Sequence, residues 1–314
     1  MSGTDQWAIV WVDLAQGPIE LDALREATTA LDEVGAILAM REEVSGVQSF
    51  TAAESPTQRP RLCIYTRPDG IEALHGVVAG LLDGFGLIGS TRAEVRDDEE
   101  WKDAWKAFYK PLTFGEHQLL LRPSWIERQP GDPALEVVID PGRAFGTGLH
   151  QTTQLCLQRL CALARRDDVR PTSIFDLGCG SGVLSMAAAR LFEGTSRMFA
   201  VDIDPEATDT TKENLELAGL TERIDVQTGV LEALDAERFD LIVANIRPVV
   251  LIPAAPAMRD RLSSGGTLTV SGILGEELDE VWKAYEAAGF VLDTRAGGGR
   301  RHLDTWSALD LVLP

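Results

Sequence analysis

Residue types that form disulfides or bind metals are scarce in this chain. Among its 314 residues are 4 cysteines and 4 histidines. The cysteines, at positions 63, 156, 161 and 179, form no CxxC pair. This scarcity argues against a disulfide framework and against a metal site, and we expect neither. The reducing cytoplasm is the location that this cysteine usage predicts.

Basic residues are also in short supply. The chain has 29 Lys and Arg against 49 Asp and Glu, a net charge of −20. A surface this acidic repels phosphate backbones, so we expect no direct binding of nucleic acid. The charge suits a basic macromolecular partner, such as a lysine-rich protein.

Long apolar runs are missing as well. The first 17 residues, "MSGTDQWAIVWVDLAQG", contain no basic residue, and Asp13 interrupts their apolar run. We therefore expect no signal peptide, no membrane span and no membrane partner. The hydrophobic fraction of 45% nonetheless supplies a sizeable core, for one large or two medium domains.

Residues 1–96 alternate between strand and helix patterns. Strands are expected at 7–14, 36–43, 61–67 and 87–95, and helices at 20–35 and 70–85. A break rich in Ser, Pro and Thr covers 49–60. The order βαββαβ predicts a small ferredoxin-like α+β domain. A linker over 97–125 follows, and a helix that carries two tryptophans is expected at 97–112. Two short strands are expected near 117–125 and 134–140.

From about residue 150 strands and helices alternate regularly. Strands are expected at 173–177, 197–204, 223–229, 239–246 and 265–274, with two more in the tail. Helices are expected after residue 150 and at 184–192, 205–219, 248–262 and 276–289. This alternation predicts an α/β domain, a doubly wound and mostly parallel sheet, over residues 126–314.

A glycine-rich motif, "DLGCGSG" at 176–182, lies between an expected strand and an expected helix. Glycines at such a turn let the backbone approach a ligand closely. Asp202 ends the next expected strand, where an acidic side chain typically binds ribose hydroxyls. A tight turn and a helix-capping Asp are the structural alternative. The combination, in this strand–turn–helix–strand context, favours a nucleoside site.

The spacing of the glycines narrows the choice of nucleoside cofactor. The motif reads G-x-G-x-G after Asp176, whereas the dinucleotide fingerprint is G-x-G-x-x-G. It resembles the S-adenosylmethionine (SAM) loop of Rossmann-like methyltransferases, and the ammonium group of SAM suits a nearby acid. None of the three tyrosines has a lysine four residues on, which excludes the usual short-chain dehydrogenase pair.

Five segments together resemble one family. "DPGRAFGTGLHQTT" (140–153), "DLGCGSGVL", "VDIDPEA", "ANI" and "SGIL" are similar, in order and spacing, to the bacterial ribosomal-protein methyltransferases of the PrmA type. The similarity is strongest over about residues 98–290. It implies a SAM-dependent methyltransferase domain at 126–314 and a substrate-recognition role for residues 1–96. It also implies transfer of methyl groups to lysine or N-terminal amines of large-subunit ribosomal protein eleven.

The resemblance also implies individual roles. Asn245 is the candidate for orienting the amine, and His150 is a second catalytic candidate; the alternatives are a turn-forming Asn and a structural His. Thr152 or Thr153 at the end of the first segment also suits a helix N-cap. The implied cofactor-binding residues are Phe145, Gly146, Thr147, Thr153, Asp176, Gly178, Gly180, Asp202, Ile203 and Asn245.

The chain departs from the family pattern beside the expected acceptor pocket. Leu149 and Gln151 replace the usual Thr and Pro, and Arg247-Pro248 replaces Leu-Ala. These changes bear on the substrate more than on the cofactor. Two alternatives therefore stay open: a methyltransferase of another protein or of a small molecule, and a SAM-binding protein without catalysis.

Overall fold

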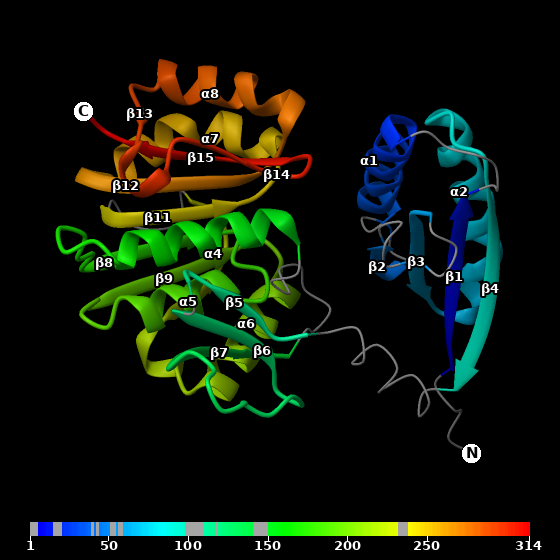
Figure 1. The fold of residues 1–314 in the computed structure, drawn as a ribbon, viewed down its shortest axis with the longest axis horizontal. Helices are drawn as coiled ribbons and strands as arrows, with labels where there is room; N and C mark the ends of the chain where they lie inside the picture. Colours follow the sequence, from blue (N-terminus) through cyan, green and yellow to red (C-terminus); the bar gives the residue numbers. More distant parts are fainter. Residues whose placement is uncertain are drawn as a thin grey trace. The chain divides into compact units, whose positions relative to one another are not determined.

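The chain forms two compact units, Met1–Tyr109 and Lys110–Pro314. The computed structural model describes residues 6–14, 21–38, 41, 44–50, 55, 59–97, 110–116, 118–140, 150–231 and 238–314. Figure 1 draws both units, and each is considered by itself.

The first unit is a four-stranded antiparallel sheet with two helices. Its elements are β1 (Gln6–Leu14), α1 (Leu21–Leu38), β2 (Val44–Phe50), β3 (Arg61–Thr66), α2 (Ile71–Gly84) and β4 (Gly89–Asp97). The strand order is β2-β3-β1-β4, and all its neighbouring strands are antiparallel. Buried residues of β1 such as Val10 and Val12 pack with Leu31 of α1 and Leu74 of α2. The element order βαββαβ is thus observed, while the ferredoxin-like classification stays a prediction.

The strand expected at 36–43 is wrong. Helix α1 continues to Leu38, and the second strand is Val44–Phe50. Leu31, Val34 and Leu38 are all buried, and their spacing of three and four residues keeps one helical face on the sheet. Because packing of this face on the sheet favours the helix, residues 36–38, which were expected to begin a strand, form the end of α1 instead.

The second unit is built on an eight-stranded sheet. Its order is β10-β9-β8-β11-β12-β15-β13, with β14 paired to β15. The strands are β8 (Ser173–Leu177), β9 (Arg197–Asp202), β10 (Asp225–Thr228), β11 (Phe239–Asn245), β12 (Leu262–Leu274), β13 (Val291–Leu292), β14 (Arg300–Leu303) and β15 (Trp306–Val312). Strands β8 to β12 are parallel, and β13, β14 and β15 join antiparallel.

Helices cover both faces of this sheet. They are α4 (Gln151–Ala164), α5 (Val183–Leu191), α6 (Pro205–Ala218), α7 (Pro248–Arg261) and α8 (Leu278–Ala287). Alternate residues of β11 point to opposite faces: Leu241 and Val243 pack with α4 and α5, whereas Ile242 and Ala244 pack with α7 and α8. Figure 1 shows α7 and α8 on one side of β11 and β12 and α4 on the other. This is the Rossmann-like doubly wound arrangement that the sequence predicts, and that prediction is confirmed.

A small sheet completes the α4 side of the unit. It has the order β5-β6-β7, from β5 (Leu112–Phe114), β6 (Leu119–Pro123) and β7 (Leu135–Ile139). Single 3₁₀ turns lie at Pro68–Gly70, Thr221–Arg223, Gly275–Glu277 and Arg295–Gly297. The tail supplies β13, β14 and β15 rather than the two expected strands. Most of the expected linker helix, residues 98–109, lies outside the described residues.

Candidate functional site

The sheet reverses its winding direction between β8 and β11. From β8 the chain proceeds outward to β9 and β10, and then returns to β11 on the opposite side. Leu177 of β8 pairs with Val201 of β9 and with Ala244 of β11. The residues that follow these three, Gly178, Asp202 and Asn245, therefore end neighbouring strands at one level. Ligands bind at such a switch point in open α/β sheets.

The glycine loop after β8 is tightly folded. Gly178, Gly180 and Gly182 have φ values of 74°, 55° and 79°, the left-handed region that favours glycine. A Cβ on Gly178 would lie 2.2 Å from Cγ2 of Ile246, the residue after Asn245. The loop thus passes so close to the end of β11 that a side chain at position 178 would clash with Ile246.

Asp202 holds the loop from the β9 side. Its Oδ2 accepts a hydrogen bond from the Gly180 amide at 2.9 Å, and its Oδ1 accepts one from the Asp204 amide at 3.1 Å. A carboxylate has about four acceptor positions, so it retains capacity for ligand hydroxyls. Ile203, next in the chain, is 73% exposed, which leaves its apolar side chain available for contact with a ligand.

Asp176 is the buried acid of the motif. Its side chain is 2% exposed, and Oδ2 accepts a hydrogen bond from Ser185 Oγ at 2.6 Å. Oδ1 is buried without a hydrogen-bond partner among the described residues. Burial raises the pKa of Asp176 to about 6, partly offset by the hydrogen bond from Ser185. One oxygen of this acid is therefore an unsatisfied acceptor.

Asn245 and Thr153 are in direct contact. Asn245 Nδ2 donates to Thr153 Oγ1 at 3.2 Å, which joins β11 to the first turn of α4. Asn245 Oδ1 is buried and, among the described residues, has no partner. This oxygen is a second unsatisfied acceptor. It lies on the same face of the sheet as Asp176, since β8 and β11 are neighbours and Asp176 pairs with Val243.

His150 is the N-cap of α4. Its Nδ1 accepts from the Thr152 amide at 3.4 Å and lies 2.8 Å from Thr152 Oγ1. Its ring meets the Trp306 ring edge to face, with centroids 4.8 Å apart. Burial lowers the pKa of His150 to about 4, so the imidazole is neutral at pH 7. These contacts suit a cap, and the catalytic role stays a prediction.

Polar contacts fasten α4 to the strands after it. Ser271 Oγ donates to the Thr152 carbonyl at 3.1 Å, and Arg301 Nη1 donates to the Leu155 carbonyl at 2.6 Å. Because Ser271 pairs with Asn245 in the sheet register, the first turn of α4 is held on both β11 and β12. The position of Thr153 therefore depends on the C-terminal strands.

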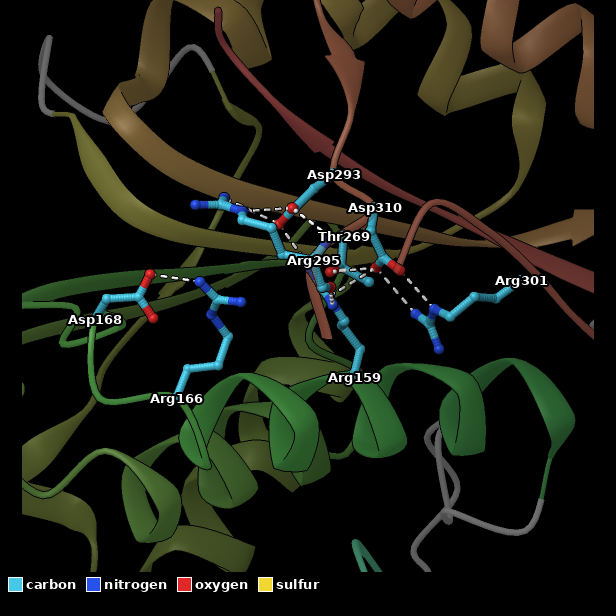
Figure 2. Close-up of polar contacts among 8 residues, drawn as sticks. All are labelled: Arg159, Arg166, Asp168, Thr269, Asp293, Arg295, Arg301 and Asp310. Carbon is cyan, nitrogen blue, oxygen red and sulfur yellow. Dashed lines mark hydrogen bonds and ion pairs between the residues drawn. The ribbon is translucent and has the colours of Figure 1, made fainter. Parts of the chain in front are cut away.

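A buried charge cluster strengthens this attachment (Figure 2). Arg159 of α4 forms an ion pair with Asp293 at 2.6 Å and another with Asp310 at 3.4 Å. Burial would raise the pKa of Asp293, but hydrogen bonds from Arg295 and the charge of Arg159 outweigh it and lower that pKa. All three members of the Arg159 pairs are almost fully buried, so each charge requires the others.

Three of the predicted cofactor-binding residues, Phe145, Gly146 and Thr147, lie in 141–149, outside the described residues.

Three residues of the observed site were not predicted, namely Arg159, Ser271 and Asp310. Arg159 and Asp310 did leave a signal, because each is the one charged residue in a mostly apolar stretch, "LCLQRLCALA" and "SALDLVL". Such a charge, once buried, needs a partner.

Neither a cluster of metal-ligand side chains nor a helix long and apolar enough to span a membrane is found in the part of the chain that the structure describes. It has no group of three or more His, Cys, Asp or Glu side chains placed to hold a metal ion. No helix within it combines the length and apolarity needed to cross a bilayer.

Comparisons with known proteins agree with the fold. The family model described as "Ribosomal protein L11 methyltransferase (PrmA)" matches residues 22–311. A relative named ribosomal protein L11 methyltransferase from Pelotomaculum thermopropionicum is 40% identical over 256 residues, 80% of this chain and 78% of its own length. One of the same name from Pelobacter propionicus is 46% identical over 179 residues, which cover 57% of each chain.

A solved structure is also similar. A crystal structure of ribosomal protein L11 methylase from Lactobacillus delbrueckii subsp. bulgaricus aligns with a TM-score of 0.57 at 31% identity. The alignment covers 65% of this chain and 99% of that one. The doubly wound fold and these relatives together define a methyltransferase of the Rossmann-like class. Within that class, the chain belongs to the ribosomal protein L11 methyltransferase (PrmA) family.

Proposed function

We propose that this chain transfers methyl groups from SAM to amino groups of large-subunit ribosomal protein L11. The observation that carries the proposal is the pair of unsatisfied acceptors, Asp176 Oδ1 and Asn245 Oδ1, at the switch point of the sheet. A buried acceptor without a donor costs free energy unless a ligand supplies the donor. Both atoms would be satisfied by a ligand that supplies N–H donors or a positive charge.

SAM fits the residues present. Its ammonium group suits Asp176, and its ribose suits Asp202, which ends β9 beside the glycine loop. A dinucleotide would instead place a pyrophosphate at this loop, and a phosphate suits the unpartnered acceptor Asp176 Oδ1 less well than an ammonium group does. SAM, when bound, supplies a methyl group on a sulfonium, a good leaving group. The residues of the chain have to bind it, exclude water and orient the acceptor amine.

The acceptor amine must lose its proton before it reacts. A lysine with an ordinary pKa of about 10.4 is charged at pH 7, and deprotonation costs about 4.6 kcal/mol. An α-amino group, with a pKa of about 7.7–8.0, costs only about 1 kcal/mol. Burial beside neutral groups disfavours the ammonium form, and Asn245 and the neutral His150 supply such surroundings. Asn245 Oδ1 then accepts a hydrogen bond from the amine and aligns its lone pair.

The first unit serves to recognise the protein substrate. The residues assigned to the cofactor all lie in Lys110–Pro314, and the net charge of −20 suits a basic ribosomal protein in the cytoplasm. A chain lacking residues 1–109 should bind SAM with unchanged affinity and lose methylation of L11. Methylation at the full-length rate would show that recognition lies in the second unit.

The direct test is transfer of label from SAM. The purified chain is incubated with methyl-labelled SAM and purified L11, and the protein is then digested and examined by mass spectrometry. Methylated lysine or N-terminal residues in L11 are the expected result. A second lysine-rich ribosomal protein is the matched control and should stay unlabelled. Tight SAM binding without labelling of L11 would contradict the assignment of L11 as the substrate, whereas the assignment of SAM as the cofactor would still hold.

A further inference from the structure

Two buried side chains of α6 face the glycine loop. Thr211 and Asn214 are 0% and 2% exposed and lie three residues apart, on one face of the helix. Thr211 Oγ1 donates to the Gly180 carbonyl at 2.8 Å, and Asn214 Nδ2 donates to the Ser181 carbonyl at 3.0 Å. One helix face thus holds two consecutive carbonyls of the loop.

Asn214 makes a further backbone contact. Its Oδ1 accepts a hydrogen bond from the amide of Asp140, just after β7, at 3.0 Å. Both ends of its side-chain amide are therefore used, one on the segment after β7 and one on the glycine loop.

Thr211 fits against the loop as closely as a glycine allows. A Cβ on Gly182 would lie 2.8 Å from Cγ2 of Thr211. Thr211 Oγ1 also lies 3.4 Å from Cys179 Sγ. The loop and this face of α6 are packed together without room for another carbon atom.

The other side of the loop is held by Asp202. The Gly180 carbonyl is directed to Thr211, while the Gly180 amide donates to Asp202 Oδ2. Glycine has wide conformational freedom, so a loop with three of them needs external contacts to keep one conformation. Thr211 and Asp202 therefore hold Gly180 from both sides, and the Gly180 amide in turn holds the Asp202 carboxylate.

We propose that Thr211 and Asn214 are positioning residues for the methyl donor. By holding the carbonyls of Gly180 and Ser181 they preorganise the glycine loop and Asp202 to bind SAM. They act through the loop and do not contact the reacting atoms. The inference rests on the proposed function only in taking SAM as the ligand of this loop.

Thr210 offers a matched control in the same helix. It is 9% exposed, and its Oγ1 donates to the Glu206 carbonyl within α6 at 2.9 Å, away from the loop. Substitutions Thr211→Val and Thr210→Val keep side-chain shape and β-branching, and each removes one hydroxyl. Only the first removes a contact to the glycine loop.

The experiment is calorimetric titration of SAM and of S-adenosylhomocysteine into the full chain and its variants. For Thr211→Val we expect Kd to rise about tenfold, with kcat at saturating SAM close to that of the parent chain. Thr211→Ser, which keeps the hydroxyl, should restore affinity, and Thr210→Val should bind normally. Asn214→Asp, which can accept from Asp140 but cannot donate to Ser181, should bind more weakly. A thermal melt of each variant establishes that it is folded.

Other outcomes would overturn the inference in distinguishable ways. Equal affinity of folded Thr211→Val and parent chain would remove the positioning role and leave SAM binding intact. Equal weakening in Thr210→Val would reduce the effect to a general loss of α6 stability. If the parent chain bound neither SAM nor S-adenosylhomocysteine, the proposed function itself would fall, and this inference with it.

Discussion

Asn245 Nδ2 donates to Thr153 Oγ1 at 3.2 Å, and the other end of the same amide, Oδ1, is a buried acceptor without a partner among the described residues. The contact fixes which end of the amide faces the site, since Thr153 is itself fully buried in the first turn of α4. An acceptor held in this way suits a neutral amine, whose N–H it can orient without adding charge.

Replacement of Asn245 by alanine should lower the rate of methyl transfer. Loss of one preorganised hydrogen bond in a dry site costs about 2.7–4 kcal/mol, by analogy with an oxyanion-hole donor, which is a hundredfold or more in rate. Single-turnover kinetics at saturating SAM measures this step. A defect in SAM affinity alone, relieved at saturation, would assign Asn245 to the cofactor instead. A lower melting temperature with an unimpaired rate would make it a turn residue.

For His150 we expect that asparagine can replace it. Asn is a good N-cap and cannot act as a general base at neutral pH. The rate should therefore stay within about twofold, whereas loss of a general base costs about 10²–10⁴ in rate. A steady-state rate measurement on folded His150→Asn decides between the two roles.

The buried imidazole also makes stability depend on pH. The pKa of His150 is about 4 when folded and about 6.5 when unfolded, so the unfolded chain binds the extra proton in this window. Its contribution is present above about pH 6.5 and is lost as pH falls through about 4. The His150→Asn variant should lack this component in urea unfolding measured from pH 7 down to about pH 4.

Binding of SAM should depend on the ionisation of Asp176. Its pKa is about 6, and a cationic ligand group favours the carboxylate form. Below about pH 6, Kd should rise by about tenfold per pH unit, and between about pH 6 and 7 it should become constant. Calorimetry over about pH 5–7 tests this, with Asp176→Asn binding weakly and without the pH dependence. The same slope in Asp176→Asn would assign the titration to another group.

The charge cluster under α4 should dominate the stability of the second unit. Arg159→Met leaves Asp293 buried without that cation, and breaking a buried pair costs about 3–5 kcal/mol. Arg166→Met, which removes the more exposed pair with Asp168 shown beside it in Figure 2, should cost no more than about 1 kcal/mol. Urea unfolding of both variants provides the comparison. Equal costs would mean that the buried cluster does not anchor α4.

Local patterns identified much of this molecule in advance. The strands β8, β9 and β11 are apolar runs that end in a glycine or a polar residue, and the glycine spacing after β8 is informative by itself. The helical periodicity of apolar residues then predicts the helices between these strands. The parallel sheet follows because such strands must be joined by crossovers. Gly178 and Asp202 were therefore predicted from their positions after two of these strands, whereas the role of Asn245 was favoured by the family resemblance.

Contacts between distant segments could not be read in this way. The apolar residues 36–38 suit either a strand or a helix, and only the packing of Leu38 in the first unit decides for the helix. The ties from Thr211 and Asn214 to the glycine loop span about thirty residues, and no periodic pattern marks them. The pairing of Arg159 with Asp293 and Asp310 depends on how α4 crosses the C-terminal strands.

The proposed methyl-donor site depends most on Asp202 as a ligand of SAM, and titration of SAM into the Asp202→Ala chain measures this role directly. A charge-assisted hydrogen bond contributes about 1.5–3 kcal/mol, so the Kd for SAM should rise at least about tenfold. Asp204→Ala is the control, since Asp204 caps α6 two residues further on and should leave Kd unchanged. Unchanged affinity in a folded Asp202→Ala chain would contradict the placement of the methyl donor at the end of β9.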